Sequence, residues 1–336
     1  MSTIKDIAFS KEELLKCTGF SPTFISDDLN LSVTSILKTK EKALLPKVEG
    51  NKKGILQYTN LSVFYNSARK IPFFSAYNID GADKKTKISR SNSFHADPRI
   101  SSEIQLSQDF YKFKYEDPAK RTLHTVFEIG HVAAHNEMSW GKDAQLQTYR
   151  TFHFPNSFPQ AEILNSGLWR SLETYIVNET STIDKNKKIS VFTGPFILNS
   201  DPYYKNVESF QVPILFFKVV VFSTEKGIYS TAFVMSHEKK IKELGILKED
   251  LELLGKTEPV LEFSDFKYKK VFQVSIGLLE KQTGLNFTWK GVKKVKIKDN
   301  INQIQIIKDT KDATDAGNQL GKSSTKPKES ITMILP

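Results

Sequence analysis

The stretch from residue 128 to residue 176 constrains the fold of this chain more than any other. It begins EIGHVAAHNEM, where His131 follows a short apolar run typical of a β-strand. It continues through TFHFPNSFPQ, with Asn156 25 residues after His131, and ends in AEILNSGLWRSLETYI, whose pattern predicts a helix. This order predicts a functional site assembled from the end of a strand and one face of a helix.

The predicted helix carries three residues at helical spacing. Asn165 and Glu173 are eight positions apart with Trp169 midway, so all three project roughly from one face. A carboxamide oxygen on this face can bind a hard cation such as Mg²⁺, with water filling the remaining positions. Because imidazole titrates near neutral pH, His131 is the natural general base. Phosphodiester hydrolysis needs a base and a charge-neutralising cation, so the stretch predicts a metal-dependent nuclease site.

Composition favours a polyanionic partner. Lys and Arg number 48 against 38 Asp and Glu, which gives a net charge of +10. The single cysteine, Cys17, excludes an internal disulfide and a cysteine-cluster zinc site, and fits a reducing compartment. The N-terminus has no apolar run of signal-peptide length, and no segment reaches the roughly 18 to 20 apolar residues of a membrane span. We therefore expect a soluble, cytoplasmic protein that does not enter membranes.

Composition also changes along the chain. Residues 1–53 end in a Lys-rich segment with Pro46 and Gly50, which predicts an N-terminal appendage and linker. Residues 54–292 hold the β-rich and helical patterns of one large domain. Residues 293–336 lose aromatics and gain Lys, Asp, Gly, Ser and Thr, which predicts a basic, extended C-terminal tail.

Hydrophobic patterns predict a mixed fold. Apolar runs of strand length occur at residues 61–65, 73–77, 189–192, 214–222 and 228–235, the first two forming a hairpin. Helical patterns occur at residues 10–17, 239–254 and 271–283, the first beginning with the capping-box spacing of Ser10 and Glu13. The predicted class is therefore α+β.

The stretch resembles the DNA/RNA non-specific endonuclease family, the sugar-non-specific nucleases with a ββα-metal core. A family motif, Asp-Arg-Gly-His, ends in a pair that Gly130 and His131 match. Two further motifs, Asn-x-x-Pro-Gln and Leu-Asn-x-Gly-x-Trp-x-x-Leu-Glu, are matched by Asn156, Pro159, Gln160, Leu164, Asn165, Gly167, Trp169, Leu172 and Glu173. The resemblance spans residues 56–289 and is densest over residues 127–175.

The resemblance implies a fold and a set of roles. The fold would be a ββα-metal nuclease core with a central, largely antiparallel sheet flanked by helices. His131 would be the general base, Asn165 would ligate the catalytic Mg²⁺ or Mn²⁺, Asn156 would support the site, and Glu173 would act in the water shell of the metal. Arg99, Gln160 and Trp169 are expected to contact the substrate. The substrates would be DNA and RNA, bound with little sequence preference and with strong salt dependence.

Two departures from the family pattern concern arginines. Ile129 stands where the motif has arginine, and Val177 stands where members often carry one, a turn after the helix glutamate. Losing one electrostatic donor to a transition state costs on the order of 10² to 10³ in rate. Arg90, where the family carries an upstream arginine, is the expected catalytic substitute, with Arg121 and Arg150 as alternatives.

Other interpretations stay open. Taken singly, His131 could be a satisfied structural histidine, Asn156 a turn residue and Glu173 a solvated helix charge; their joint order and spacing favour the nuclease. His131 and His135 have the spacing of a zinc helix, but HVAAH lacks the glutamate of HExxH, which argues against zinc hydrolysis.

Two other functions also fit the sequence. Ile129 suggests a pseudo-nuclease that binds nucleic acid with weakened or lost catalysis. The segment Gly19–Phe24 resembles a short region that precedes the nuclease domain in bacterial members. It suggests a regulated effector of a bacterial defence or conflict system, with this segment recruiting a partner or an inhibitor. Family members are often dimers, so a homodimer is also expected.

Overall fold

The computed structural model describes residues 3–117, 121–162, 169–181, 187–248, 271–297 and 306–307. The α-helices are α1 (Ile4–Phe9), α2 (Lys11–Leu15), α3 (Thr39–Lys42), α4 (Ala144–Arg150), α5 (Trp169–Ser181), α6 (Glu238–Glu243) and α7 (Ile276–Thr283), and the 3-10 helices are η1 (Ser102–Ile104), η2 (Gln108–Tyr111) and η3 (Phe154–Asn156). The strands are β1 (Leu56–Tyr58), β2 (Leu61–Asn66), β3 (Ile71–Asp80), β4 (Lys114–Asp117), β5 (Thr122–Thr125), β6 (Glu128–His131), β7 (Ser157–Gln160), β8 (Lys188–Pro195), β9 (Tyr203–Tyr204), β10 (Val207–Gln211), β11 (Leu215–Thr224), β12 (Gly227–Ser236), β13 (Val271–Val274), β14 (Val292–Lys294) and β15 (Ile306–Ile307).

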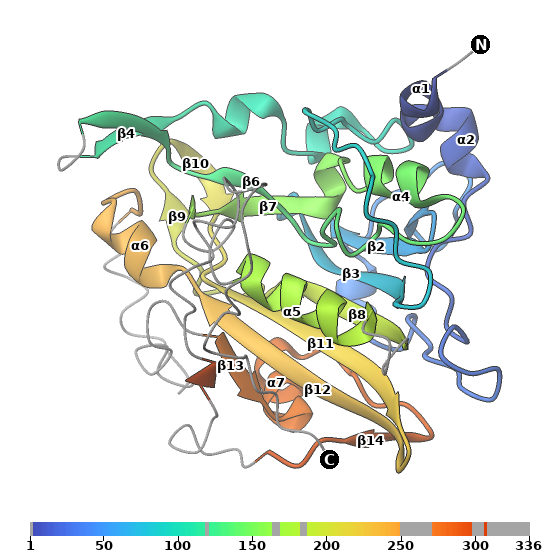
Figure 1. The fold of residues 1–336 in the computed structure, drawn as a ribbon. Coiled ribbons are helices and arrows are strands. Elements are labelled where there is room, and N and C mark those ends of the chain that lie inside the picture. Colours follow the sequence, from blue (N-terminus) through green and yellow to red (C-terminus); the bar gives the residue numbers. More distant parts are fainter. Residues whose placement is uncertain are drawn as a thin grey trace, which may run out of the picture.

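A central sheet organises the molecule (Figure 1). Its strand order is β1-β2-β3-β8-β11-β12-β13-β15, and every one of these neighbours pairs antiparallel. β14 joins β12 in parallel, and β4–β5, β6–β7 and β9–β10 form separate two-stranded hairpins. The predicted α+β class with a largely antiparallel sheet is confirmed, as are the five predicted strands.

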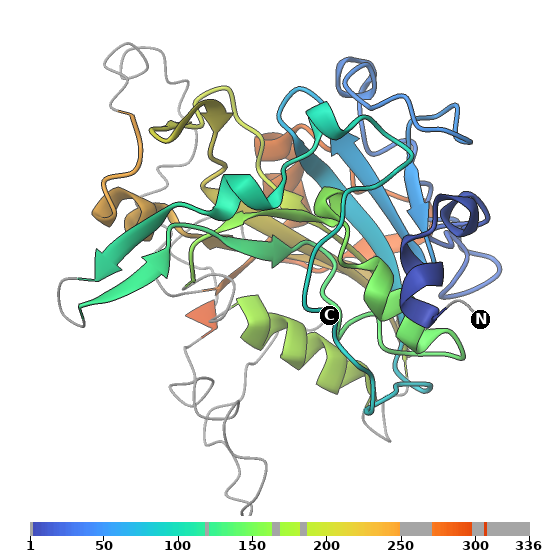
Figure 2. The ribbon, with the colours of Figure 1, turned by 90° about the horizontal axis from the view of Figure 1, so that it is seen from above.

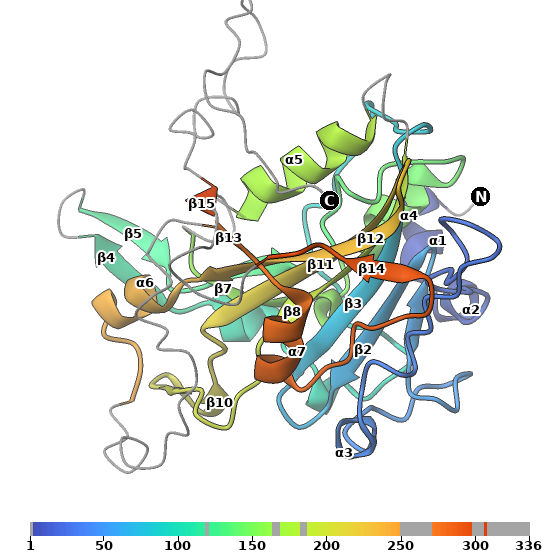
Figure 3. The same ribbon diagram turned by 90° about the horizontal axis from the view of Figure 1, so that it is seen from below.

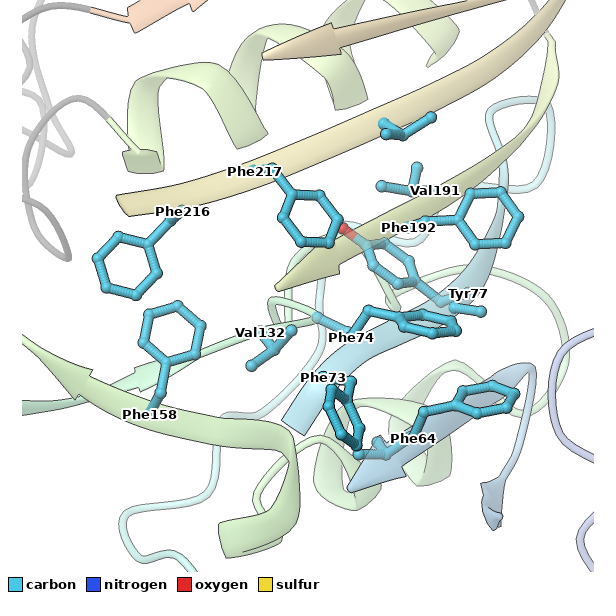
Figure 4. Packing of buried hydrophobic residues seen from close by; sticks show 14 of the residues in the cluster. Phe64, Phe73, Phe74, Tyr77, Val132, Phe158, Val191, Phe192, Phe216 and Phe217 are labelled. Carbon is cyan, nitrogen blue, oxygen red and sulfur yellow. The ribbon is translucent and has the colours of Figure 1, made fainter. Parts of the chain in front are cut away.

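The two faces of the sheet carry different partners, because side chains alternate along each strand. Phe216 of β11 stacks on Phe158 of the β6–β7 hairpin at 4.5 Å between ring centroids (Figure 4). On the same face, Lys218 lies with its Nζ atom 5.4 Å from the ring centroid of Trp169 in α5. Phe217 points to the opposite face and meets Phe287, which follows α7, at 5.6 Å. α5 and α7 thus cover opposite faces (Figure 3).

The N-terminal segment belongs to the same core. Phe20 packs against Phe192 of β8 at 5.3 Å between centroids. The backbone N–H of Gly19 donates to the carbonyl of Tyr58 at 3.0 Å, and that of Ser21 donates to Oδ1 of Asn78 at 2.8 Å. Further buried members of the cluster from this segment are Leu14, Leu29, Leu31, Ile36 and Leu37. The described residues before β1 therefore pack as part of the core, and Gly19 and Ser21 are hydrogen-bonded to β1 and β3.

The three predicted helices differ from the observed ones. The helix near residues 10–17 is present as α2, but its N-cap Ser10 makes no side-chain bond, and the capping box forms one helix earlier between Thr3 and Asp6. The helix predicted at residues 239–254 is present as α6 but ends at Glu243, and residues 249–254 lie outside the described residues. Residues 271–274 are a strand, not the start of a helix. Their sequence VFQV pairs with β12 and β15, and the β-branched and aromatic side chains suit this buried strand. α7 begins after Ser275, whose hydroxyl accepts from the N–H of Leu278 at 3.0 Å.

The boundary expected at residue 293 falls inside the sheet. β14 spans Val292–Lys294, and the side chains of Val295 and Ile297 are buried after it. β15 pairs with β13, and the rest of the predicted tail lies outside the described residues.

Within the described part of the chain, no helix has the length and apolarity needed to cross a membrane. The β4–β5 hairpin extends from the body of the protein (Figure 2).

Candidate active site

The β6–β7 hairpin presents the histidine of the Gly-His pair. The strands pair antiparallel, with Gly130 opposite Phe158. A Cβ atom on residue 130 would lie 1.9 Å from Oε1 of Gln160, so only glycine fits there. Since side chains alternate along a strand, Ile129 and His131 project from the same face of β6. Residue 129, where the family motif has arginine, and His131, the expected base, therefore lie on the same side of the hairpin.

Asn156 fixes the backbone behind this histidine. Its Oδ1 accepts hydrogen bonds from Oγ of Ser75 and from the N–H of Ala133, both at 3.0 Å. Its Nδ2 donates to the carbonyls of Ala133 and Thr151, also at 3.0 Å. The side chain is fully buried and offers no free group to a substrate. Asn156 therefore supports the backbone segment that follows His131.

His131 lies in an aromatic pocket. Its ring centroid is 4.7 Å from that of Phe94 and 4.5 Å from that of Phe152. Burial, then the neighbouring His135 and Arg90, hold the pKa of His131 well below its usual 6.5, so the ring is neutral at neutral pH. Its Nε2 atom is buried and has no hydrogen-bond partner among the described residues. A neutral imidazole with an unpartnered nitrogen can accept a proton.

Two exposed arginines bring positive charge to the pocket. The Cζ atom of Arg90 lies 5.8 Å from the ring centroid of Phe152, which also packs on His131. Burial, followed by the charges of Arg90 and Arg170, lowers the pKa of His135 to about 4. Arg90, the residue expected to substitute for the motif arginine, therefore lies beside a ring that packs on His131, and Arg170 adds a second cation.

Beneath the pocket lies a buried set of Tyr77, Glu137 and Lys218, called here the Lys218 cluster. Nζ of Lys218 donates to Oε1 of Glu137 at 2.9 Å and to the hydroxyl of Tyr77 at 2.7 Å. The Tyr77 hydroxyl donates to Oε2 of Glu137 at 2.7 Å, and the N–H of Ala134 donates to the same oxygen at 3.1 Å. All three side chains are fully buried. The cluster connects β3 and β11 to the loop that follows His131.

Glu173 adds a second carboxylate beside this cluster. It lies on α5 and is almost fully buried. Burial, and then the charge of Glu137, raises the pKa of Glu173 to about 8, while Lys218 and Arg170 oppose the shift. Among the described residues no ion pair compensates Glu173 directly. The neighbourhood therefore holds the carboxyls of Glu137 and Glu173 together with the cations Lys218 and Arg170.

Arg99 does not contact substrate in this structure, contrary to expectation. Its Nε and Nη2 atoms donate to the two carboxylate oxygens of Asp97 at 3.0 and 2.7 Å. Its Nη1 atom donates to the carbonyls of Leu14 and Gln57 at 3.1 and 2.7 Å. The Tyr58 hydroxyl also donates to Asp97, at 2.6 Å. Tyr58, Asp97 and Arg99, called here the Arg99 cluster, attach α2 to the sheet and leave no guanidinium face for phosphate.

The other predicted contacts are also buried. Gln160 and Trp169 are 0% and 1% exposed, so neither side chain can reach a substrate without rearrangement. The amide atoms of Gln160 and Nε1 of Trp169 have no hydrogen-bond partner among the described residues. Arg150 is buried and bonded to Thr59, whereas Arg121 is exposed in the turn before β5. Of the arginines considered, only Arg90 acts electrostatically on His131.

The residues present suit a hard cation. Asn165, the expected metal ligand, lies outside the described residues, and the described ranges hold no group of three or more His, Cys, Asp or Glu that could bind a metal. Magnesium binds through one or two protein oxygens and keeps several waters, so it needs no such group. A buried carboxylate without a paired cation favours bound positive charge. Glu173 therefore fits the role of a carboxylate that faces a cation through water.

Comparison with known families identifies the chain. The model of the DNA/RNA non-specific endonuclease family matches residues 41–294. The chain belongs to this family. In family terms, the paired strands β6 and β7, with α4 and η3 between them in sequence, and the helix α5 form the ββα unit, with His131 on the first strand and Glu173 on the helix. Ile129 remains a departure from the family motif.

Two similar proteins extend the comparison. One is the uncharacterized protein y4fB of Sinorhizobium fredii (strain NBRC 101917 / NGR234), which is 30% identical over 200 residues covering 57% of this chain. The chain spans 28% of the length of that relative. The other is a chain in the crystal structure of the EndoG/EndoGI complex, a structure that describes the mechanism of EndoG inhibition. It is 20% identical, covers 69% of this chain and 84% of that chain, and has a TM-score of 0.47.

The sequence analysis missed three contributors to this endonuclease site. Lys218 interrupts the apolar strand run ILFFKVVVF, and a charge inside a buried strand signals a buried partner. That partner, Glu137, had no sequence signal of its own. Arg170 follows Trp169 directly, and its approach to His135 and Glu173 depends on how α5 sits on the sheet.

Proposed function

We propose that this chain is a Mg²⁺-dependent, sugar-non-specific endonuclease that hydrolyses phosphodiester bonds of DNA and RNA, with Mn²⁺ able to replace Mg²⁺. The observation that carries the proposal is His131, a neutral imidazole with an unpartnered nitrogen, set beside the exposed Arg90. Family membership supports the reaction class. The net charge of +10 suits a polyanionic substrate whose phosphates, not bases, are contacted.

Each residue has a role in this mechanism. His131 takes a proton from the attacking water, and its low pKa keeps it ready to do so at neutral pH. Arg90 offers its guanidinium to the phosphate as negative charge develops. Asn156 and Glu137 hold the backbone on the far side of His131. Asn165 and Glu173 would hold the cation, which supplies charge neutralisation at the phosphate and the leaving oxygen.

Replacing His131 is the direct test. His131→Ala is expected to lower the rate of plasmid nicking in Mg²⁺ by about 10² to 10⁴-fold, because the general base is lost. His124→Ala is the matched control, since His124 lies on the projecting β4–β5 hairpin. Nicking by wild type should also stop in excess EDTA and return with added Mg²⁺ or Mn²⁺.

The variants separate a catalytic defect from a folding defect. His131→Ala should keep the melting temperature of wild type to within a few degrees. Equal nicking by His131→Ala and His124→Ala would rule out His131 as the base. Cleavage of only one of the two nucleic acids, in parallel assays on plasmid and on single-stranded RNA, would rule out a sugar-non-specific enzyme.

Ile129 favours a second candidate, a pseudo-nuclease that binds nucleic acid on the same site. Because Ile129 and His131 share one face of β6, an arginine at position 129 would enter the pocket. Ile129→Arg is expected to raise nicking by up to about 10²-fold, with Ile129→Gln as an uncharged control of similar length. Duplex binding by wild type without any metal-dependent nicking, together with activity in Ile129→Arg, would favour the pseudo-nuclease.

A further inference from the structure

A second histidine borders the pocket. The ring centroid of His135 lies 5.8 Å from that of His131 and 6.0 Å from that of Phe152. The residue is half-buried, and no hydrogen bond to its ring joins it to another described residue. Its backbone carbonyl accepts from Oγ1 of Thr148 at 3.4 Å. The imidazole of His135 therefore lies beside the expected base, and among the described residues it makes ring contacts but no side-chain hydrogen bond.

The loop that carries His135 is held on both sides. Before it, Asn156 binds both backbone groups of residue 133, and Oε2 of Glu137 accepts from the N–H of residue 134 at 3.1 Å. After it, the carbonyl of residue 136 accepts from Nζ of Lys84 and, at 2.8 Å, from Oγ of Ser139. The bonds before His135 are buried and those after it are part-buried. They hold the backbone on both sides of His135, which favours a preformed position for a binding group.

Three cations face His135. The charges of Arg90, Arg170 and Lys84 act on it, and with burial as the largest cause they lower its pKa to about 4. Its ring is therefore neutral at neutral pH and has one N–H donor. Among the described residues no carboxylate forms an ion pair with Arg90 or Arg170, and both side chains are exposed. A neutral donor near two exposed arginines suits a phosphate oxygen.

Arg170 connects this group to the rest of the site. It occupies the first turn of α5, is exposed, and its charge acts on both His135 and Glu173. Arg170 therefore adds positive charge near a histidine and a carboxyl of the pocket, in a chain where Ile129 and Val177 stand at two positions at which the family carries arginines.

We propose that His135 and Arg170 together bind a phosphate of the nucleic-acid backbone next to the scissile one. His135 donates its ring N–H to a non-bridging oxygen, and Arg170 neutralises the same phosphate. The pair takes over the phosphate contact that the arginines missing at positions 129 and 177 would make. That this phosphate lies next to the scissile one rests on the proposed nuclease function. The binding of a phosphate by the two residues does not.

Steady-state kinetics test the pair in the active enzyme. His135→Ala and Arg170→Gln are each expected to lower kcat/KM for a duplex oligonucleotide by about 10- to 100-fold, since each removes a hydrogen bond to a charged group. His135→Gln, which keeps an N–H donor, should recover most of the loss. The double variant should lose less than the product of the two single losses, because both residues bind one phosphate. His124→Ala is the matched histidine control and should retain wild-type kinetics.

Binding without turnover separates this inference from the nuclease proposal. Fluorescence anisotropy with a labelled duplex in EDTA measures phosphate contacts whether or not the protein cuts. Arg170→Gln should weaken binding and reduce the slope of log K against log salt by about 1, and His135→Ala should weaken binding with little change in slope. If wild type cuts nothing but these shifts appear, the nuclease proposal fails and the phosphate site stands.

Two results would overturn the inference. One is an His135→Ala variant with wild-type melting temperature and with kcat/KM and affinity within twofold of wild type. The other is an equal loss in His135→Ala and His135→Gln, which would mean that shape, not a donor, is required at this position. Should His135→Ala fail to fold, Arg170→Gln alone decides, because this exposed side chain supports no packing.

Discussion

The Arg99 cluster and the Lys218 cluster contain the same kinds of residue but have different roles. Each is buried, and in each a carboxylate accepts from a tyrosine hydroxyl and pairs with a cation that also lies over the tyrosine ring. Cζ of Arg99 is 4.9 Å from the ring centroid of Tyr58, and Nζ of Lys218 is 5.4 Å from that of Tyr77. The Arg99 cluster attaches α2 to the sheet, whereas the Lys218 cluster supports the loop behind His131.

The clusters differ in the charge beside them. Arg99 and Asp97 balance one for one, and the guanidinium completes its bonding with the carbonyls of Leu14 and Gln57. Lys218 balances Glu137 but leaves Glu173, whose pKa is raised to about 8. A balanced buried cluster stabilises structure alone. Beside the Lys218 cluster, the raised pKa keeps Glu173 largely protonated at neutral pH, and a bound cation would favour its ionised form.

The largest expected effect comes from removing Lys218. Lys218→Met leaves Glu137 buried without its cation, and the free energy of unfolding should fall by about 3 to 5 kcal/mol in urea titration. A double variant, Lys218→Met with Glu137→Leu, should recover part of this stability but not the nicking activity, because the loop behind His131 loses its support. Full activity in the double variant would contradict a positioning role for the cluster.

A smaller effect is expected at the other cluster. Arg99→Lys removes the two-point contact with Asp97 and the bonds to two carbonyls, and should cost about 1 to 3 kcal/mol. Hydrogen exchange should increase in α2 and β1, while nicking per folded molecule stays at the wild-type rate. A drop in that rate larger than the drop in folded protein would show that the two clusters are not separate in function.

The effect of pH should have opposite signs at the two clusters. Glu173 has a folded pKa of about 8 against an ordinary value of 4.5, so its stabilising contribution is full below pH 4.5 and is lost as pH rises toward 8, by at most about 1.4 kcal/mol per unit. His153, which interacts electrostatically with Asp97, has a pKa of about 4, mainly through burial, so its contribution is present above pH 6.5 and is lost as pH falls toward 4.

Melting temperatures measured from pH 4 to pH 9 check both signs. Glu173→Gln should remove the loss on the alkaline side and leave the acid side unchanged. Divalent cation should raise the melting temperature of wild type at pH 8 more than that of Glu173→Gln, because the ionised carboxylate attracts it. Identical pH curves for wild type and Glu173→Gln would contradict the raised pKa.

The sequence was sufficient where local pattern decides structure. Alternating apolar residues identified β2, β3, β8, β11 and β12, and the Gly-His pair identified the end of β6. The pattern failed at Val271–Val274, where the helical periodicity of α7 continues backward into a strand that only pairing with β12 reveals. Local signals cannot report a partner that is distant in sequence.

Arginines show the same limit at the site. Arg90 and Arg99 lie nine positions apart in a polar, basic stretch, and nothing in the stretch separates an exposed arginine from a buried one. What separates them is the carbonyl of Leu14, 85 residues away from Arg99, and the ring of Phe152, on which Arg90 rests. Burial of Trp169 and Gln160 likewise follows from how the β6–β7 hairpin and α5 sit on the sheet.

The close approach of Gly130 to the Gln160 side chain depends on the register of β6 against β7. If β6 slipped by one residue along β7, its inward and outward faces would exchange, and His131 would turn away from the pocket. A side chain other than hydrogen at position 130 would force the Gln160 amide aside, so the two strands fit together in one way only. A single deletion within β6 would therefore invert the site.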